Sequence, residues 1–187
     1  MNWDYTLFAR INGLAGHHQV LDLVMRGMAK YGVFLYVIYL LYLWFRTSRT
    51  TSDKKLVLKA VLAALIALLI NQVIGLVYFR PRPFVHHSVN MLITKSMDPS
   101  FPSDHATGSS ALTATVACAG SKLGILMIVT TLVLMISRVY VGTHYPGDVL
   151  GGALTGILGG IAANFFWPHL DKFSEMLIGL YNRFIPA

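Results

Sequence analysis

His144 and Asp148 stand four residues apart, with a Pro-Gly break between them and an apolar run after them. Since the break places the histidine at or just before a helix N-terminus, the carboxylate of Asp148 can reach one nitrogen of the imidazole ring. The other nitrogen keeps its lone pair, and a nucleophile oriented by a second group is the arrangement of covalent catalysis. A histidine in a turn beside a helix-capping aspartate has the same spacing, so this pair alone leaves both interpretations open.

Three arginines lie at the ends of apolar runs. Arg80 and Arg82 belong to the segment Arg-Pro-Arg-Pro, whose prolines end a helix and hold the chain extended, and Arg138 lies six residues before His144. A guanidinium is a rigid fork of donors that matches phosphate oxygens. Arginines at the end of a membrane helix can also simply anchor it to lipid headgroups, so taken alone they do not establish a site.

A third polar cluster follows Pro102, a residue that suits the first turn of a helix. The unpaired N–H groups of such a turn and the helix dipole bind anions. Ser103 adds a hydroxyl donor, and His105 adds a group that titrates near neutrality. The alternative here is a helix-capping serine with an incidental histidine.

Composition indicates what positions these clusters. Of the 187 residues, 55% are hydrophobic and 12% are charged, about half the charge of an average soluble domain (about 25%). We therefore predict an all-α, polytopic membrane bundle in one domain, residues 1–187 with a core at 56–167. Amphipathic helices are expected at 4–13 and 19–28, and an amphipathic tail at 171–187. About five membrane-spanning helices are expected, at 28–45, 56–79, 103–120, 123–140 and 148–167.

Loop charge predicts the orientation of the bundle. The loop 46–55 carries four basic residues and one acidic residue, which predicts a cytoplasmic location. Alternation of the helices then places all three polar clusters at the extracytoplasmic end. Charged groups near a bilayer are costly and usually face one another or a cavity, so we expect a single site. Arginines, histidines and a helix N-terminus around one pocket match the needs of phosphoryl transfer.

Other features narrow the possibilities. The net charge of +7 is not arranged as a basic stripe with aromatic residues, so no nucleic-acid partner is expected. No metal or other cofactor is expected, because the sequence shows no cluster of carboxylates or cysteines. Cys118, the single cysteine, excludes an intrachain disulfide and is expected to be a small buried side chain. Gly152, Gly156 and Gly160 recur every four residues, which predicts close helix packing.

The three clusters together resemble the signatures of the type 2 phosphatidic acid phosphatase (PAP2) superfamily. Ser137-Arg138, five residues, His144, three residues and Asp148 resemble its third signature. Pro102-Ser103-Asp104-His105 resembles the second, usually Pro-Ser-Gly-His, and Arg82-Pro83 resembles the end of the first, Lys-x6-Arg-Pro. The Pro-Ser-Asp-His variant and the short chain are similar to the bacitracin-resistance type of undecaprenyl-diphosphatase from Gram-positive bacteria.

The resemblance implies roles for most of these residues. His144 would attack phosphorus and form a phosphohistidine, and Asp148 would orient His144. His105 would protonate the leaving group and later activate water. The phosphoryl oxygens would be held by Arg82, Arg138 and Ser103.

The chain departs from the superfamily pattern at two positions. Gly75 stands where the superfamily has lysine, and Asp104 stands where it has glycine. We hypothesise that Arg80 supplies the missing charge and reaches the second phosphate of a diphosphate. Asp104 either caps the helix, which we favour, or holds Arg80 or Arg82.

The resemblance implies hydrolysis of undecaprenyl diphosphate to undecaprenyl phosphate at the outer face of the cell membrane, which would blunt bacitracin. The expected partners are a polyprenyl diphosphate lipid and the surrounding membrane lipids. A phosphatidylglycerophosphate or phosphatidate phosphatase, or a lipid phosphotransferase, would use the same residues. A small anion transporter is a more distant alternative, and arginines clustered at one end of the bundle argue against it.

Overall fold

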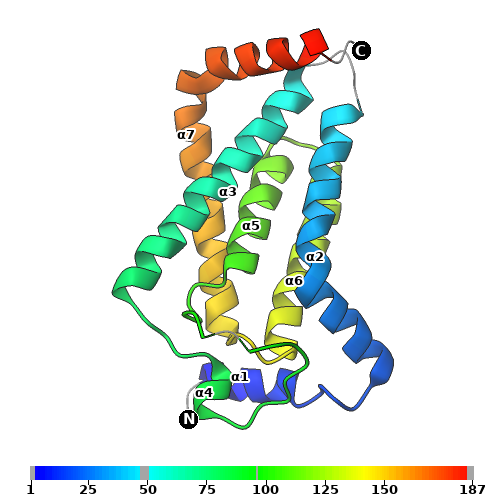
Figure 1. Cartoon of the computed structure of the whole chain (residues 1–187), viewed down its shortest axis with the longest axis vertical. Helices are drawn as coiled ribbons and strands as arrows, with labels where there is room; N and C mark the ends of the chain where they lie inside the picture. The colour runs from blue at the N-terminus through cyan, green and yellow to red at the C-terminus, as the bar shows by residue number, and fades with distance from the viewer. Residues whose placement is uncertain (1–2, 47–50, 96, 185–187) are drawn as a thin grey trace.

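The computed structural model describes residues 3–46, 51–95 and 97–184, and in these ranges every regular element is an α-helix. The predicted all-α membrane bundle is confirmed. The long helices α2, α3, α6 and α7 run side by side around the shorter α5, and α1 and α4 lie at the lower end in Figure 1. The helices are α1 (Trp3–Asn12), α2 (Gln19–Phe45), α3 (Thr51–Val77), α4 (Pro83–His86), α5 (Asp104–Cys118), α6 (Leu123–Tyr140) and α7 (Pro146–Phe184).

The short helix α5 lies at the centre of the bundle, packed against α3, α6 and α7 and more lightly against α2. Its residues are mostly Ala, Ser, Thr and Gly, whose small side chains let neighbouring backbones approach. At 15 residues it is shorter than the predicted 103–120 span. Among the described residues, four helices are long and apolar enough to cross a bilayer, namely α2, α3, α6 and α7, instead of the five expected.

Glycines of α7 allow the closest helix contacts, as predicted for two of the three positions. A Cβ atom on Gly152 would lie 2.6 Å from the carbonyl oxygen of Ser103, and one on Gly156 would lie 2.5 Å from that of Thr107. Gly160 is less confined, with its nearest neighbouring atom at 3.4 Å. The third close contact is made by Gly159, which meets Ala63 and Ala67 of α3. The side of α7 that packs against α3 is therefore rotated from the side that packs against α5.

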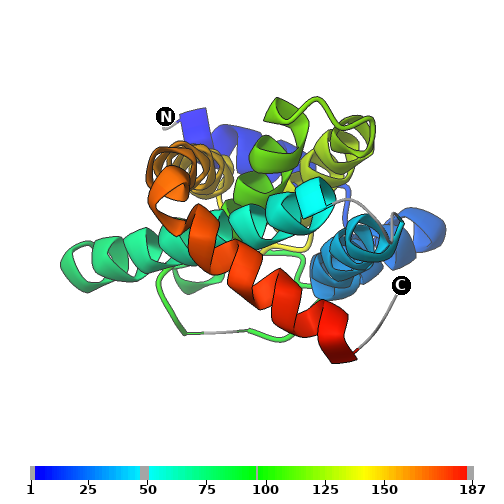
Figure 2. The ribbon, with the colours of Figure 1, turned by 90° about the horizontal axis from the view of Figure 1, so that it is seen from above.

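Two other expectations change. The segment 19–28 is not a separate surface helix, because α2 continues without a break from Gln19 to Phe45. The fifth predicted span, 148–167, does not end there, since α7 extends through Pro168, which removes a backbone hydrogen bond, and includes the expected tail as far as Phe184. Residues 185–187 of that tail lie outside the described residues. The last part of α7 turns and crosses the end of the bundle, as the red segment shows in Figures 1 and 2.

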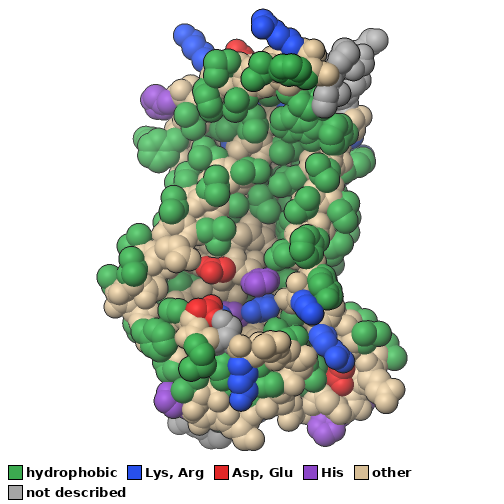
Figure 3. Space-filling model, viewed as in Figure 1, with side chains coloured by type: hydrophobic (Ala, Val, Ile, Leu, Met, Phe, Trp, Pro, Cys, Tyr) green, Lys and Arg blue, Asp and Glu red, His purple; other side chains and the backbone are tan. Residues whose placement is uncertain are grey.

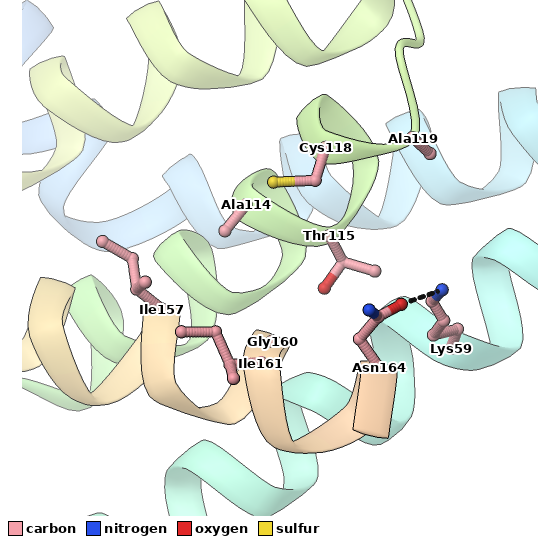
Figure 4. A pocket seen from close by; sticks show the side chains of 9 residues that line it. All are labelled: Lys59, Ala114, Thr115, Cys118, Ala119, Ile157, Gly160, Ile161 and Asn164. Atoms are coloured by element: carbon pink, nitrogen blue, oxygen red, sulfur yellow. Dashed lines mark hydrogen bonds between the residues drawn. The ribbon is translucent and has the colours of Figure 1, made fainter. Parts of the chain in front are cut away.

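Large apolar side chains cover the outside of the long helices, which suits contact with lipid. At the end of the bundle where α5 stops, a cavity of about 260 Å³ opens between α3, α5 and α7 (Figure 4). Cys118 lies at its edge and is exposed, which contradicts the expected burial. Figure 3 shows that charged side chains and histidines gather around a hollow near the opposite end.

Candidate active site

A tight turn between α6 and α7 carries His144. Gly142 in this turn has φ +89°, and a Cβ atom there would lie 2.4 Å from Cγ1 of Val89, so both the conformation and the space require glycine. The N–H and hydroxyl of Thr143 both donate to the carbonyl of Arg138, at 3.2 and 2.9 Å. The turn thereby holds His144 under the loops, where 2% of the residue is exposed.

The hydrogen bonds of His144 define its tautomer. Nε2 lies 3.1 Å from Nη1 of Arg82 and 3.4 Å from Nη2 of Arg138. Since a guanidinium can only donate, Nε2 accepts and therefore carries no proton. Nδ1 lies 2.9 Å from the carbonyl oxygen of Ser100, which can only accept, so Nδ1 carries the proton. The lone pair of Nε2 points toward the two arginines.

Asp148 approaches His144 as the sequence predicts, but at ion-pair distance and without a direct hydrogen bond. Its Oδ2 lies 3.8 Å from Nδ1 of His144 and instead accepts from the hydroxyl of Ser100 at 2.5 Å and the N–H of Tyr145 at 2.8 Å. The carbonyl of Ser100, in place of the carboxylate, orients the imidazole. Asp148 is fully buried and accepts the hydroxyl bond of Ser100, so it holds in place the residue whose carbonyl bonds the imidazole.

Arg80 is placed differently from the prediction that it contacts phosphate. Nη1 donates to Oδ1 of Asp148 at 2.7 Å, and Nη2 donates to Oδ2 of Asp4 at 2.5 Å. Its guanidinium also stacks on the ring of Tyr145, 4.3 Å from the centroid. Arg82 has the dihedral angles of polyproline II, φ −70° and ψ 157°. With three residues per turn in that conformation, side chains two positions apart diverge, so Arg80 faces Asp148 while Arg82 faces His144.

Arg82 and Arg138, whose guanidiniums face Nε2 of His144, are held in place by further contacts. Arg82 donates to the carboxylate of Asp98 at 2.8 Å and to the carbonyl of Thr143 at 3.0 Å. Arg138 donates through Nη1 to the carbonyl of Ala29 at 2.9 Å. Within the part of the chain that the structure describes, its buried Nε has no hydrogen-bond partner, so a donor remains for a ligand.

The start of α5 adds a second unpaired donor. Ser103 is the N-cap residue and is fully buried, and its hydroxyl finds no partner among the described residues. Two residues on, His105 is half-buried and lines a cleft of about 610 Å³ together with Arg138. The predicted convergence of the three polar clusters is thus seen in the structure. The remaining lining residues of the cleft are Arg26, Ala29, Lys30, Met91, Leu92, Ile93 and Thr94.

Asp104 does not hold Arg80 or Arg82, and it supports the start of α5 as an acidic residue of the first turn and not as the N-cap. It is the first residue of α5 and follows the N-cap Ser103. Its carboxylate accepts a bond of 2.9 Å from Asn71 of α3, while the described contacts of Arg80 and Arg82 go to other acceptors. Asp104 therefore ties the start of α5 to α3.

Burial is the main reason that the pKa of His144 falls to about 4, and the charges of Arg138 and Arg82 lower it further, while Asp148 opposes them. The imidazole is consequently neutral at pH 7. No group of three His, Cys, Asp or Glu residues that could hold a metal is found in the described ranges.

Sequence reasoning gave no role to three residues that complete the site, namely Ser100, Asp98 and Asp4. Ser100 and Asp98 lie next to the second signature, so their position in the loop was the available signal. Asp4 belongs to α1 and reaches the site across 76 residues of sequence, a contact that no local pattern announces.

Comparison with known proteins agrees with this geometry. The model of the PAP2 superfamily matches residues 56–170. The undecaprenyl-diphosphatase BcrC of Bacillus subtilis (strain 168) is 37% identical over 182 residues, which cover 97% of this chain and 93% of the relative. Four described helices are long and apolar enough to cross a bilayer, and a solved structure with the same fold is that of a transmembrane phosphatase. The chain is therefore a multi-pass membrane protein.

Two solved structures share the fold. The crystal structure of Aquifex aeolicus LpxE has a TM-score of 0.73 and 26% identity, over 87% of this chain and 95% of that one. The PAP2-type phosphatidylglycerolphosphate phosphatase from Bacillus subtilis has a TM-score of 0.65 and 26% identity, over 89% of this chain and 87% of that one.

Proposed function

Because the chain belongs to the PAP2 superfamily, we propose that it hydrolyses undecaprenyl diphosphate to undecaprenyl phosphate and phosphate. The observation that carries the proposal is the unprotonated Nε2 of His144, which faces two guanidiniums at 3.1 and 3.4 Å. A neutral nucleophile beside two fixed cations matches an attack on a phosphoryl group, and the 37% identical relative is named for this substrate.

In the first step, Nε2 attacks the terminal phosphorus, and the bond from that phosphorus to the bridging oxygen breaks. The proton stays on Nδ1, which donates to the carbonyl of Ser100, and the dipole of this carbonyl stabilises the positive charge that develops on the ring. Arg82, Arg138 and the free hydroxyl of Ser103 would bind the three equatorial oxygens. Catalysis by positioning and by fixed charges is what a loose phosphoryl-transfer transition state requires.

His105 is the group available to handle protons, because it lines the cleft beside Arg138 and remains partly accessible. It would give a proton to the bridging oxygen as undecaprenyl phosphate leaves. It would then take a proton from a water molecule that attacks the phosphohistidine. The P–N bond breaks in this second step, which releases phosphate and restores neutral His144.

The site would face the extracytoplasmic side of the cell membrane. Lys54 and Lys55 of the basic loop 46–55 lie on the side of the bundle where the end of α7 crosses, bonded to Asn182 and Glu175. The turn from α6 to α7, which contains His144, lies at the other end (Figure 1), and basic loops stay in the cytoplasm. Hydrolysis there would remove the diphosphate that bacitracin sequesters and so give resistance.

A phosphate-release assay on purified protein tests the function. We expect turnover of undecaprenyl and farnesyl diphosphate, none with His144→Ala, and an acid-labile, alkali-stable phosphoprotein during turnover. Unchanged turnover in His144→Ala would refute the nucleophile. Preference for phosphatidylglycerophosphate, favoured by the structural likeness to the Bacillus subtilis phosphatase, would replace the substrate but keep the mechanism.

A further inference from the structure

A diphosphate carries a second phosphate, and the residue first expected to bind it is committed elsewhere. Arg80 bonds Asp4 and Asp148, both buried carboxylates. The cations that contact Nε2 of His144 serve the terminal phosphate. If the protein acts on a diphosphate, the charge of the other phosphate needs different partners.

The cleft next to His105 offers two such cations from α2. Arg26 and Lys30 both line it, and at a spacing of four residues they share one face of the helix. Between them in sequence, Ala29 is completely buried and accepts a hydrogen bond of 2.9 Å from Arg138. This bond fixes the same face of α2 against the site, so Arg26 and Lys30 are held at the rim of the cleft.

The charge of the cleft suits an anion. Its lining residues in the described part of the chain include Arg26, Lys30, Arg138 and His105 and no carboxylate. The nearest acidic residue on α2, Asp22, is turned to the N–H of Gly16 at 3.0 Å and the hydroxyl of Tyr140 at 2.8 Å. A volume of about 610 Å³ leaves ample room for a phosphate beside His105.

From this arrangement we propose that Arg26 and Lys30 bind the phosphate attached to the lipid, the one that becomes the leaving group. The inference rests on the proposed function. When the bond between the terminal phosphorus and the bridging oxygen breaks, negative charge moves onto that second phosphate. Arg26 and Lys30 neutralise it while His105 donates a proton to the bridging oxygen. A lipid with a single phosphate has no group at this position, so these two residues select for diphosphates.

The test uses purified full-length Arg26→Gln, Lys30→Gln and the double variant with farnesyl diphosphate as substrate. We expect kcat/KM to fall about tenfold for each single variant, which is the loss of one modest charge-assisted contact. The inhibition constant of inorganic diphosphate should rise about tenfold, while that of inorganic phosphate, which needs only the site beside His144, stays within about twofold.

Arg10→Gln is the matched control, since it removes another exposed arginine from the same end of the molecule. Arg26→Lys should recover most of the activity. Unchanged constants in the Gln variants would show that the two side chains only anchor headgroups, and equal losses for both inhibitors would show a general defect. Either result overturns the proposal. Absence of phosphate release by the wild type from any diphosphate would instead refute the proposed function.

Discussion

Replacing Asp4 tests whether the N-terminal helix belongs to the catalytic machinery. Asp4 lies outside the segment that matches the superfamily, and 4% of it is exposed. It accepts from Nη2 of Arg80 at 2.5 Å and from the N–H of Gly147 at 2.7 Å. Through Arg80 it is connected to Asp148, and Asp148 fixes the segment that orients the nucleophile.

The structure bounds the size of the effect. Removal of one partner from a fully buried charge pair costs about 3–5 kcal/mol. Arg80 is 21% exposed in its side chain and keeps its bond to Asp148, so we expect the lower end of that range, about 3 kcal/mol for Asp4→Ala. If the whole loss appears in the transition state, kcat falls about 100-fold. Asp4→Asn keeps an acceptor for Gly147 and should lose about tenfold.

The assay is steady-state phosphate release from farnesyl diphosphate. Because Asp4 does not contact the cleft, we expect the loss in kcat, with KM changed by less than about threefold. Asp53→Ala is the matched control, since it removes a carboxylate from an ion pair with Arg46 at the other end of the bundle. Wild-type kcat in Asp4→Ala, or an equal loss in the control, would refute the connection from α1 to the nucleophile.

Three further predictions concern the site and its support. The pKa of His144 near 4 predicts that the acid limb of kcat/KM, where the nucleophile becomes protonated, lies near pH 4; an acid limb near 6.5 would contradict it. Ser100→Ala, which keeps the carbonyl bond to His144 but removes the hydroxyl bond to Asp148, should lower kcat about tenfold in the same assay. Gly156→Ala places a Cβ atom 2.5 Å from a carbonyl oxygen of α5 and should lower the free energy of unfolding by about 1–3 kcal/mol. The loss should appear as a lower unfolding temperature in detergent, whereas Gly160→Ala, with its nearest atom at 3.4 Å, should be nearly neutral.

Much of the bundle follows from the sequence because its signals are local. Apolar runs of about 20 residues, separated by a basic loop and proline breaks, predict the long helices and their alternation. Alternation alone then brings Arg82, His105 and His144 to one end, which the structure confirms. The length of α5 was overestimated because its small residues give no clear end to the apolar pattern before Gly120.

Which side chains hydrogen-bond to one another in the site depends on the conformation of the loops, and the spacing of residues in the sequence does not reveal it. The four-residue interval between His144 and Asp148 predicts a direct bond, and the helical turn does bring the two within 3.8 Å. The loop 87–103 nevertheless places Ser100 between them, where its carbonyl and its hydroxyl take both partners. Such an insertion comes from a segment 44 residues away and has no signature in the spacing.

The missed cations of α2 have a different cause. Arg26 lies in a segment that reads as an amphipathic surface helix, and Lys30 lies at the start of an apolar run, so each has an ordinary role at a membrane boundary. One continuous helix of 27 residues removes that division and places both side chains on one face. The bond from Arg138 to the backbone of Ala29 then turns this face toward the site. A cation on a membrane helix therefore becomes a candidate ligand only when the helix is known to pack against a catalytic residue, and here Arg138 provides that contact.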